Sequence, residues 1–397
     1  MPHFQYLLVG GGMTSAAAVT GIRTVDPDGS IGLIGQETDR PYARPPLTKG
    51  LWKGKSVDSI WRKSVNKGVE LMLDRTATEL DIQGKSVRDD HGAVVTFDKL
   101  LLATGGTPRR LPFGGDDIIY FRTLADYQRL REMSGPGKRI GVIGGGFIGS
   151  ELAAALTMTD TEVVMVFPDS SIGSRAYPAD LAAFVTDYYR EKGVTVLAER
   201  QATGLERSGP QLSLHVAGEN GEQSETVAVD GVVAGIGIQP NVDLAERAGL
   251  PVDNGIVVDE FLRAGAPDIY AAGDVAAFVN PALDRRIRVE HEDNAKAMGR
   301  QAGRNMAGAA EPYEYLPSFY SDLFDLGYEA VGDVDARLET VADWTEPFRK
   351  GVIYYLQDGR VRGVLLWNVW DQVPAARELI AAPDPVKPED LKGRLPS

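Results

Sequence analysis

The sequence contains no cysteine among its 397 residues. Structural disulfides, thiolate nucleophiles, cysteine-ligated zinc and iron–sulfur clusters are therefore excluded. Histidine is also scarce. Its four positions, His3, His91, His215 and His291, show no metal-ligand spacing. We expect no metal site in this chain.

Long apolar runs are absent as well, since no stretch approaches the roughly 18 residues that a membrane span requires. Acidic residues outnumber basic ones by 56 to 42, which gives a net charge of -14 and an isoelectric point near 4.9. This excess disfavours binding to nucleic acids or to anionic membranes. The start of the chain, MPHFQYLLVGGG, enters a strand almost directly. No signal peptide is visible there, and a cytoplasmic location is expected.

Glycine is abundant instead, with 45 residues, and many of them fall in two similar patterns. In each pattern a short apolar strand leads into a glycine-rich loop, an alanine-rich helix and a second strand. The first copy comprises Phe4–Val9, Gly10 to Gly12, Met13–Ile22 and Ser30–Ile34. The second comprises Arg139–Ile143, Gly144 to Gly149, Glu151–Met158 and Glu162–Phe167. The chain therefore contains two βαβ units, each a candidate for binding a nucleotide.

Both loops follow the spacing G-x-G-x-x-G. The spacing is complete in the second copy, at Gly144, Gly146 and Gly149, and ends in Ser15 in the first. Glycines at these positions permit a tight turn and let backbone N–H groups approach a pyrophosphate at the start of the helix. Serine is small enough to preserve the close packing of helix and strand. The alternative for either copy is an ordinary glycine-rich turn, but two copies in matching contexts favour two dinucleotide sites.

An acidic residue follows the second strand of each unit, Glu37 in the first and Asp169 in the second. A carboxylate in this place can accept hydrogen bonds from ribose hydroxyls, although Asp169 could instead cap its loop. No lysine or arginine follows the strand before Arg175 in the second unit. The 2′-phosphate of NADPH would require such a cation, so NADH is favoured over NADPH. Two dinucleotide sites without cysteine indicate electron transfer between a bound flavin and a diffusing nicotinamide.

Three later strands also lead into glycine: Lys99–Thr104 before Gly105, Gly231–Ala234 before Gly235, and Ile269–Ala272 before Gly273. From about residue 311 the pattern changes to that of an antiparallel sheet, as in Gly351–Leu356 and Val361–Trp367. A helix is expected over Val373–Ala381. The tail that follows is rich in proline and polar residues, so it is expected to be extended or mobile.

The stretch RPYARPPLTKG, from Arg40 to Gly50, is too broken by proline to form a helix or a central strand. It places Arg40, Arg44 and Lys49 just after the first βαβ unit. Its prolines fix the path of the chain, which lowers the entropy lost when the loop becomes ordered.

These features occur together in a known family. LLVGGG, RPYARPPLTK, LLLATGGTPR, IGVIGGGFIGSELA, VVAGIGIQPN and IYAAGDVA follow the order seen in the FAD-dependent pyridine-nucleotide oxidoreductases. The proline-rich loop resembles the RPPLSK of oxygenase-type ferredoxin reductases and of apoptosis-inducing factor. Several stretches look closer to the latter, namely VFPDSSIGSRAYP, RVEHEDNA, SDLFDLGYEAVGDVD and KGVIYYLQDGRVRGVLLWNVW. The resemblance covers nearly the whole chain.

This resemblance implies an α/β fold with two Rossmann-like dinucleotide-binding domains, for FAD and NAD, and a C-terminal α+β domain. The FAD-binding domain would be split in sequence, over residues 1–113 and 242–310. The NAD-binding domain would be inserted at 114–241, and the C-terminal domain would span 311–397.

The same resemblance implies the site residues. The FAD site would be formed by Gly10, Gly12, Met13, Thr14, Ser15, Glu37, Arg44, Lys49, Ala103, Thr104, Gly105, Gly273, Asp274, Glu290, His291 and Tyr320. The NAD site would be formed by Gly144, Gly146, Phe147, Ile148, Gly149, Glu151, Asp169, Gly235 and Gly237. Lys49 resembles the lysine beside flavin N5, Glu151 the acid that pairs with it, and Phe147 the aromatic that lies against the flavin. These three are the catalytic candidates.

Several of these residues also have plainer interpretations. Lys49 could be a solvated loop lysine, and His291 a satisfied core histidine. Tyr320 and Trp367 are expected to serve packing more than redox chemistry. The cluster Arg285-Arg286-Arg288 could dock an acidic ferredoxin or could be a solvated hairpin.

Two functions are in keeping with the resemblance. In the favoured one, the protein is an NADH-dependent flavoprotein that passes electrons from FAD to a one-electron acceptor such as a ferredoxin. In the alternative, it is a redox sensor like apoptosis-inducing factor, with slow NADH oxidation, a stable reduced-flavin–NAD complex and NADH-dependent dimerisation. A third interpretation is an NADH oxidase that passes the electrons to oxygen as a side reaction. The chain is expected to be a monomer or an NADH-dependent homodimer.

Overall fold

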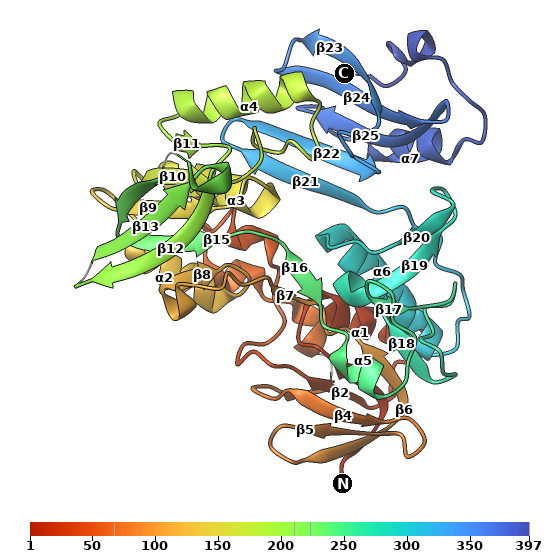
Figure 1. Ribbon diagram of the computed structural model, residues 1–397. Helices are drawn as coiled ribbons and strands as arrows, with labels where there is room; N and C mark the ends of the chain where they lie inside the picture. The colour runs from red at the N-terminus through yellow and green to blue at the C-terminus, as the bar shows by residue number, and fades with distance from the viewer. Residues whose placement is uncertain (67, 210, 223, 397) are drawn as a thin grey trace. The chain divides into compact units, whose positions relative to one another are not determined.

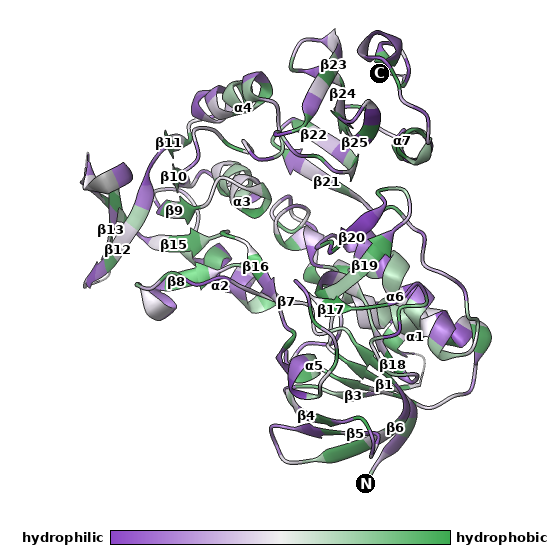
Figure 2. Ribbon diagram, turned by 45° about the vertical axis from the view of Figure 1, so that its right-hand side comes forward, coloured by the Kyte–Doolittle hydropathy of each residue, from purple (hydrophilic) through white to green (hydrophobic). Residues whose placement is uncertain are grey.

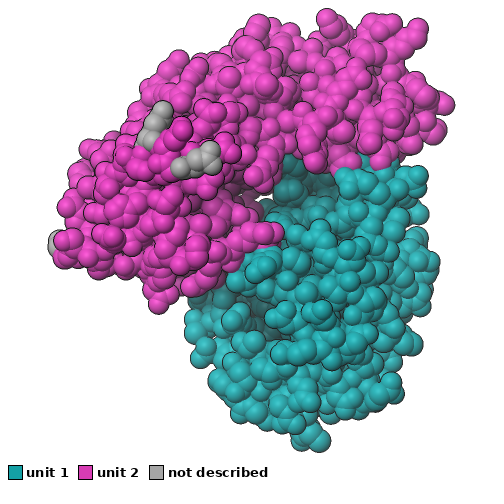
Figure 3. Space-filling view, viewed as in Figure 1, with its two compact units in different colours: residues 1–43, 56–107, 239–319 teal, residues 44–55, 108–238, 320–397 magenta. Residues whose placement is uncertain are grey.

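The computed structural model describes residues 1–66, 68–209, 211–222 and 224–396 (Figure 1). Its chain divides into two compact units, coloured separately in Figure 3. Unit 1 comprises residues 1–43, 56–107 and 239–319, and unit 2 comprises residues 44–55, 108–238 and 320–397. The proline-rich loop from Arg44 onward thus belongs to unit 2. The three-domain boundaries given above remain a prediction.

Unit 1 contains a seven-stranded mixed β-sheet and a separate three-stranded sheet, with helices beside them. Its strands are β1 (His3–Val9), β2 (Ile31–Ile34), β3 (Val69–Met72), β4 (Ala77–Asp81), β5 (Ser86–Asp89), β6 (Val94–Leu102), β17 (Ile256–Val257), β18 (Ile269–Ala271), β19 (Ala276–Asn280) and β20 (Arg285–Ile287). Its helices are α1 (Met13–Val25), α5 (Asp243–Arg247) and α6 (Glu292–Met306), with short 3₁₀ turns η2 (Val57–Ile60), η3 (Lys63–Asn66) and η6 (Gly273–Val275).

The parallel part of this sheet has the order β3-β2-β1-β6, and β18 pairs with β6. Val9 at the end of β1 is in register with Ile34 of β2 and Leu102 of β6, and Leu102 is in register with Ala271 of β18. Four strands therefore end at one edge of the sheet. In open α/β sheets, ligands bind outside this edge.

The backbones of helices α1 and α6 are in direct contact, because a glycine on each helix lies against a main-chain carbonyl of the other. A β-carbon at Gly21 would lie 2.0 Å from the carbonyl oxygen of Arg300, and one at Gly303 would lie 2.1 Å from that of Ala18. Any larger residue at either place would push the helices apart. This contact holds the middle of α1 against α6.

Unit 2 contains a second parallel sheet, a three-stranded antiparallel sheet and a five-stranded antiparallel sheet. The strands of its first part are β8 (Ile118–Tyr120), β9 (Arg139–Ile143), β10 (Glu162–Val166), β11 (Thr195–Leu197), β12 (Gln201–Ser208), β13 (Gln211–Ala217), β14 (Glu225–Val229) and β15 (Gly231–Ala234). Helices α2 (Leu124–Met133), α3 (Phe147–Thr157) and α4 (Ala179–Glu191) accompany them, with the 3₁₀ turns η1 (Pro45–Leu47), η4 (Gly115–Asp117) and η5 (Glu219–Gly221). A short pair is formed by β7 (Gly106–Pro108) and β16 (Ile238–Pro240).

The parallel sheet of unit 2 has the order β11-β10-β9-β15-β8. Ile143 at the end of β9 is in register with Val166 of β10 and Ala234 of β15. These ends repeat the arrangement in unit 1, so the two predicted βαβ units are confirmed. Figure 2 shows the apolar character of β9 and β15, which are almost wholly buried.

The rest of unit 2 is the predicted antiparallel sheet. Its strands are β21 (Ser318–Leu323), β22 (Leu326–Gly332), β23 (Glu339–Glu346), β24 (Lys350–Gln357) and β25 (Arg360–Trp367), in the order β21-β22-β25-β24-β23. Helix α7 (Val373–Ala381) packs on β22 and β25 and has the predicted bounds. Among the described residues, no helix is both long and apolar enough to cross a bilayer.

The tail after α7 differs from its prediction, because it docks on this sheet. It contains the 3₁₀ turn η7 (Pro388–Leu391), and the side chains of Leu391 and Leu395 are buried. The backbone N–H of Gly393 donates to Asp343 at 2.7 Å, and that of Leu395 donates to the Tyr354 hydroxyl at 3.2 Å. Two buried leucines in this polar, proline-rich stretch therefore anchor the tail to the antiparallel sheet.

Candidate functional site

The first glycine loop leaves an open helix start in unit 1. Gly10 has a φ of +120°, and a β-carbon there would lie 2.1 Å from the carbonyl oxygen of Ala103. Gly12 precedes α1 without any side-chain cap, and nothing lies within 4 Å of where its β-carbon would be. The unpaired N–H groups at the start of α1 therefore face free space, which suits a pyrophosphate.

Ser15 fills the third position of this loop by a hydrogen bond. Its hydroxyl donates to the carbonyl oxygen of Gly10 at 2.6 Å. At the matching place in unit 2, a β-carbon on Gly149 would lie 2.0 Å from the carbonyl oxygen of Gly144. In unit 1, the Ser15 hydroxyl thus links the helix to the glycine turn by a hydrogen bond. In unit 2, Gly149 instead lets the helix backbone contact the turn directly.

Further predicted FAD residues surround this edge of the unit 1 sheet. A β-carbon at Gly273 would lie 2.2 Å from the hydroxyl of Thr14, so η6, which contains Asp274, packs against the start of α1. The hydroxyl of Thr104 donates to the carbonyl of Asn241 at 2.7 Å, next to Gly105. The predicted residues that the structure brings together at this edge are Gly10, Gly12, Met13, Thr14, Ser15, Ala103, Thr104, Gly105, Gly273 and Asp274.

Glu37 follows β2, as expected, and already has a partner. Its carboxylate accepts a hydrogen bond of 2.5 Å from the hydroxyl of Tyr42, whose ring meets Trp61 edge-on. The proline-rich segment before Arg44 thus fixes the orientation of this acid.

His291 stands at the N-cap of α6 and stacks on Phe319, with ring centroids 4.2 Å apart. Burial lowers the pKa of His291 to about 4, while the charges of Asp274 and Asp293 act in the opposite direction. The imidazole is therefore neutral near pH 7. Its neighbour Glu290 pairs with Arg288 at 2.7 Å.

The arginine cluster Arg285-Arg286-Arg288, on and just after β20, is largely engaged within unit 1. Arg286 donates to the carbonyl of Ala277 at 2.8 Å, and Arg288 donates to that of Asp274 at 3.0 Å. These contacts favour the hairpin interpretation over a docking surface, since β19 and β20 pair as an antiparallel hairpin.

The second glycine loop repeats the open helix start in unit 2. Gly144 has a φ of +119°, and a β-carbon there would lie 2.4 Å from the carbonyl oxygen of Gly235. Nothing lies within 4 Å of a β-carbon at Gly146, which has no side-chain cap. Helix α3 begins at Phe147, four residues before the predicted start, and the side chains of Phe147 and Ile148 are exposed. This loop also suits a pyrophosphate.

The other predicted NAD residues lie near this loop. A β-carbon at Gly235 would lie 2.9 Å from the backbone nitrogen of Gly149. Gly237 follows in the same segment, and its carbonyl accepts from the backbone of Arg109 at 2.9 Å. Asp169 follows β10 and pairs with Arg175 at 3.6 Å.

The proline-rich loop forms a compact turn in unit 2. Pro45 to Leu47 form η1, and the indole of Trp52 donates to the carbonyl of Leu47 at 2.7 Å. The guanidinium of Arg44 donates to the carbonyl of Arg122 at 2.7 Å. The loop is therefore anchored at both ends, and Lys49 projects from a fixed backbone.

Lys49 and Glu151 form a buried ion pair. The ammonium lies 2.6 Å from Oε2 of Glu151, and the two side chains are only 11% and 5% exposed. The hydroxyl of Thr48 donates to the same oxygen at 2.6 Å. The Lys49 ammonium also lies 5.0 Å from the centre of the Tyr320 ring. The solvated-loop interpretation of Lys49 is therefore excluded.

Ser321 completes this group, and sequence reasoning missed its role. Its hydroxyl donates to Oε1 of Glu151 at 2.6 Å. Three donors thus compensate for the loss of water around a buried carboxylate. One chemical signal was available in the sequence. A glutamate within an apolar, alanine-rich helix is expected to be buried, and a buried carboxylate needs hydrogen-bond donors from elsewhere in the chain.

Aromatic side chains pack behind this pair. Trp367 is fully buried, stacks on Tyr328 and meets Tyr177 edge-on, which confirms its packing role. Burial, with a smaller effect from the charge of Glu151, raises the pKa of Tyr328 well above its usual value. Tyr320 differs, because the residue is 42% exposed.

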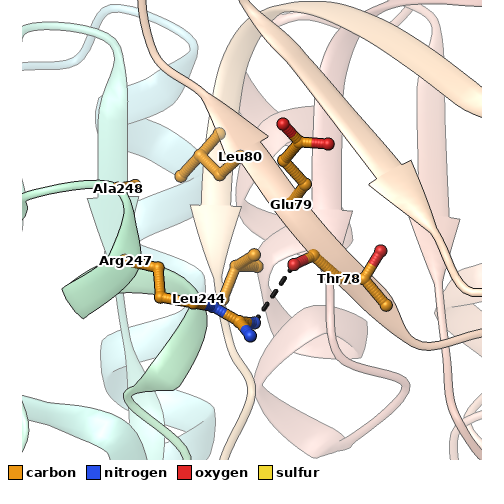
Figure 4. A pocket seen from close by; sticks show the side chains of 6 residues that line it. All are labelled: Thr78, Glu79, Leu80, Leu244, Arg247 and Ala248. Carbon is orange, nitrogen blue, oxygen red and sulfur yellow. Dashed lines mark hydrogen bonds between the residues drawn. The ribbon is translucent and has the colours of Figure 1, made fainter.

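A shallow depression of about 450 Å³ lies elsewhere in unit 1, between β4 and α5 (Figure 4). It is lined by Thr78, Glu79, Leu80, Leu244, Arg247 and Ala248. Arg247 donates to the carbonyl of Thr78 across it at 3.1 Å. None of the predicted site residues lines it.

The paired glycine loops invite comparison with known proteins. The sequence profile described as pyridine nucleotide-disulphide oxidoreductase matches residues 4–299. The chain belongs to this family. A second profile, described as apoptosis-inducing factor, mitochondrion-associated, C-term, matches residues 302–347 and 343–382. The first profile covers both βαβ units, and the second covers all five strands of the β21-β22-β25-β24-β23 sheet.

Known relatives are similar to this chain over most of their lengths. Apoptosis-inducing factor 1, mitochondrial, from Dictyostelium discoideum is 34% identical over 95% of this chain and 78% of its own. The 5,5′-dehydrodivanillate O-demethylase ferredoxin reductase subunit from a Sphingobium is 34% identical over 91% of this chain and 89% of its own. The reductase in a covalent putidaredoxin reductase–putidaredoxin complex superimposes with a TM-score of 0.89 at 29% identity, over 98% and 96% of the chains.

Family membership confirms the predicted fold class of two dinucleotide-binding domains and a C-terminal α+β domain. The chain is an NADH-dependent flavoprotein oxidoreductase, with FAD and NADH as its cofactors. The two open glycine loops fit these dinucleotides. Without cysteine, the chain cannot form the redox disulfide for which its family is named.

Proposed function

We propose that this protein passes electrons from NADH to a small iron–sulfur protein of the ferredoxin class. One observation carries the proposal: two open dinucleotide loops occur in a chain that has no cysteine. Electrons that arrive from NADH cannot pass to a disulfide of this chain. They must therefore leave to an external acceptor. The naming of one relative as a ferredoxin reductase subunit, and of another in complex with putidaredoxin, supports an iron–sulfur partner.

Bound FAD would supply two-electron reduction by NADH and release of single electrons to an acceptor. The residues of unit 1 that would hold it are Gly10, Gly12, Met13, Thr14, Ser15, Glu37, Ala103, Thr104, Gly105, Gly273, Asp274, Glu290 and His291. In unit 2, Arg44 and Tyr320 are the further candidates. The start of α1 would bind the pyrophosphate, and Glu37 would accept hydrogen bonds from a ribose.

NADH would be held by residues of unit 2, namely Gly144, Gly146, Phe147, Ile148, Gly149, Asp169, Gly235 and Gly237. The start of α3 would bind its pyrophosphate, and Asp169 would accept from the adenosine ribose. Phe147 is exposed in the present structure and would contact a cofactor ring.

Lys49 would supply positive charge where reduction makes a cofactor electron-rich. A fixed cation stabilises developing negative charge better than water does, because it needs no reorganisation. Glu151, Thr48 and Ser321 hold the ammonium in one place. We assign Lys49, Glu151 and Phe147 as the catalytic candidates on this basis.

The test is rapid mixing of the FAD-loaded protein with NADH without oxygen, followed by turnover with a [2Fe–2S] ferredoxin and cytochrome c. Fast bleaching of the flavin, and cytochrome reduction that depends on the ferredoxin, would support the proposal. Slow bleaching with a persistent long-wavelength band, and dimerisation in size-exclusion chromatography with NADH, would support a sensor resembling apoptosis-inducing factor instead. Oxygen-dependent turnover alone would indicate an NADH oxidase. A cytoplasmic location and the monomeric or NADH-dependent dimeric state remain predictions.

A further inference from the structure

Trp52 closes the turn that presents Lys49. Its backbone N–H donates to the carbonyl of Lys49 at 3.1 Å, and its indole N–H donates to the carbonyl of Leu47 at 2.7 Å. These two carbonyls lie on either side of Thr48. The Thr48 hydroxyl and the Lys49 ammonium both bind the carboxylate of Glu151. One tryptophan thus fixes the backbone on both sides of the residues that meet this acid.

The indole of Trp52 is itself clamped by helix α2. The residue is only 6% exposed. Its ring meets that of Tyr127 edge-on, with centroids 5.4 Å apart, and the guanidinium of Arg131 lies 5.3 Å from the ring centre. Tyr127 and Arg131 lie one turn apart on the same face of α2. An edge-on aromatic contact and a cation over a ring both hold an indole more firmly than burial alone does.

Helix α2 also binds the backbone of the proline-rich loop near both of its ends. The hydroxyl of Tyr127 donates to the carbonyl of Leu51 at 3.4 Å. The guanidinium of Arg44 donates to the carbonyl of Arg122, just before the helix, at 2.7 Å. A complete capping box fixes this end of α2. The helix therefore acts as a rigid support for the turn that carries Lys49.

A fixed backbone matters for Lys49 because its long side chain has many rotamers. A cation lowers a barrier most when it is already in place, and a displacement of about 1 Å can cost much of the effect. We propose that Trp52 is a positioning residue for Lys49. Its indole, clamped against α2, holds the turn so that the ammonium stays where flavin reduction needs it. This inference rests on the role of Lys49 in the proposed function.

The first test measures how firmly Lys49 is held, without any electron transfer. The full-length, FAD-loaded protein is treated with N-acetoxysuccinimide, and peptide mass spectrometry gives the acetylation rate of Lys49. Trp52→Phe keeps a buried ring but removes the indole donor. It should speed acetylation roughly twofold to tenfold, because opening of the turn then costs one neutral hydrogen bond less.

Trp344→Phe is the matched control for this measurement. Trp344 is another tryptophan of unit 2, on β23, and its ring meets that of Phe348 edge-on with centroids 5.5 Å apart. The substitution removes an indole from a similar aromatic contact away from the turn. The acetylation rate of Lys49 should therefore remain that of the wild type.

The second test asks whether Trp52 acts through Lys49. Anaerobic rapid mixing with NADH gives the rate of flavin reduction in wild type, Trp52→Phe, Lys49→Ala and the double variant. Trp52→Phe alone should slow reduction roughly twofold to tenfold. In the Lys49→Ala background it should change the rate by less than about twofold, because no ammonium is left to position. A residue that only stabilised the fold would slow both backgrounds equally.

The inference is overturned if Trp52→Phe leaves the acetylation of Lys49 at the wild-type rate, or if it slows reduction equally with and without Lys49. Should its unfolding midpoint show that Trp52→Phe does not fold, Tyr127→Leu takes its place. That variant removes the ring against the indole, and it should change both measurements in the same direction. If NADH does not reduce the wild-type flavin, the proposed function fails, while acetylation still decides whether Trp52 holds Lys49. If the flavin is reduced and acetylation is unchanged, only the positioning role is wrong.

Discussion

The ammonium of Lys49 lies 2.6 Å from Oε2 of Glu151, and both side chains are buried within unit 2. Lys49 comes from the proline-rich loop, and Glu151 comes from the first turns of α3. Splitting a buried pair by removing one partner costs about 3–5 kcal/mol, since the remaining charge is left without compensation. The pair therefore fixes a positive charge on a rigid loop, and it also fastens that loop to the helix that begins at the second glycine loop.

Replacing Lys49 with alanine should slow flavin reduction by NADH. Loss of one preorganised electrostatic group commonly lowers a rate by roughly 10²- to 10³-fold. FAD binding should persist, because the glycine loop of unit 1 is untouched. Anaerobic rapid mixing measures the rate, and flavin content after gel filtration measures binding. Lys53→Ala is the matched control, because the Lys53 side chain is 47% exposed. Its ion pair with Asp322, at 3.5 Å, is also longer than that of Lys49. Unchanged kinetics in Lys49→Ala would rule out the proposed role.

Ser321 should matter for stability through Glu151. The Ser321→Ala variant leaves Oε1 of a buried carboxylate without its 2.6 Å donor, at a cost of about 1–3 kcal/mol. Urea denaturation followed by fluorescence gives the free energy of unfolding. Ser224 provides a control, since it is exposed and its hydroxyl donates to the carbonyl of Gly221 rather than to a buried carboxylate. Equal stabilities of Ser321→Ala and Ser224→Ala would contradict the role given to Ser321.

Local pattern was sufficient to predict much of the fold. The bounds of β9, β15 and α7 agree with the sequence prediction, because apolar runs, glycine turns and helical spacing all act over a few residues. The start of α3 was placed four residues late. Phe147 and Ile148 look like part of the loop, but the helix begins as soon as Gly146 has turned the chain.

Long-range contacts were out of reach of such patterns. The Lys49–Glu151 pair came only from family resemblance, and Ser321 and Arg175 were missed as partners of Glu151 and Asp169. A hydroxyl or guanidinium carries no periodic signal that shows which distant carboxylate it will meet. The docked tail was missed for the same reason, since single leucines in a polar stretch do not reveal the surface that they cover.

Acid should destabilise unit 1 through His291. Its pKa is lowered from 6.5 to about 4 by burial, so the folded state keeps the imidazole neutral while the unfolded chain takes up a proton. The neutral His291 costs no stability above pH 6.5. The free energy of unfolding decreases as the pH falls from about 6.5 towards about 4. Thermal unfolding midpoints across this range measure it.

The contrast with two variants isolates this histidine. His291→Phe cannot take up the proton and should lose less stability across the same pH range than wild type does. His91→Asn changes an exposed histidine and should follow the wild type. Parallel pH profiles for wild type and His291→Phe would show that groups other than His291 govern the acid response.

Two glycines of the second glycine loop, Gly144 and Gly146, should respond differently when each is changed to alanine. Gly146 has a φ of -85°, and its added methyl would meet no atom within 4 Å. Gly146→Ala should therefore fold normally, but the methyl would occupy the space that the pyrophosphate needs. Gly144 has a φ of +119°, and its methyl would lie 2.4 Å from the carbonyl of Gly235. Gly144→Ala should therefore destabilise unit 2 itself. Unfolding midpoints and calorimetric titration with NAD⁺ separate the two effects, and normal NAD⁺ affinity in Gly146→Ala would place the pyrophosphate elsewhere.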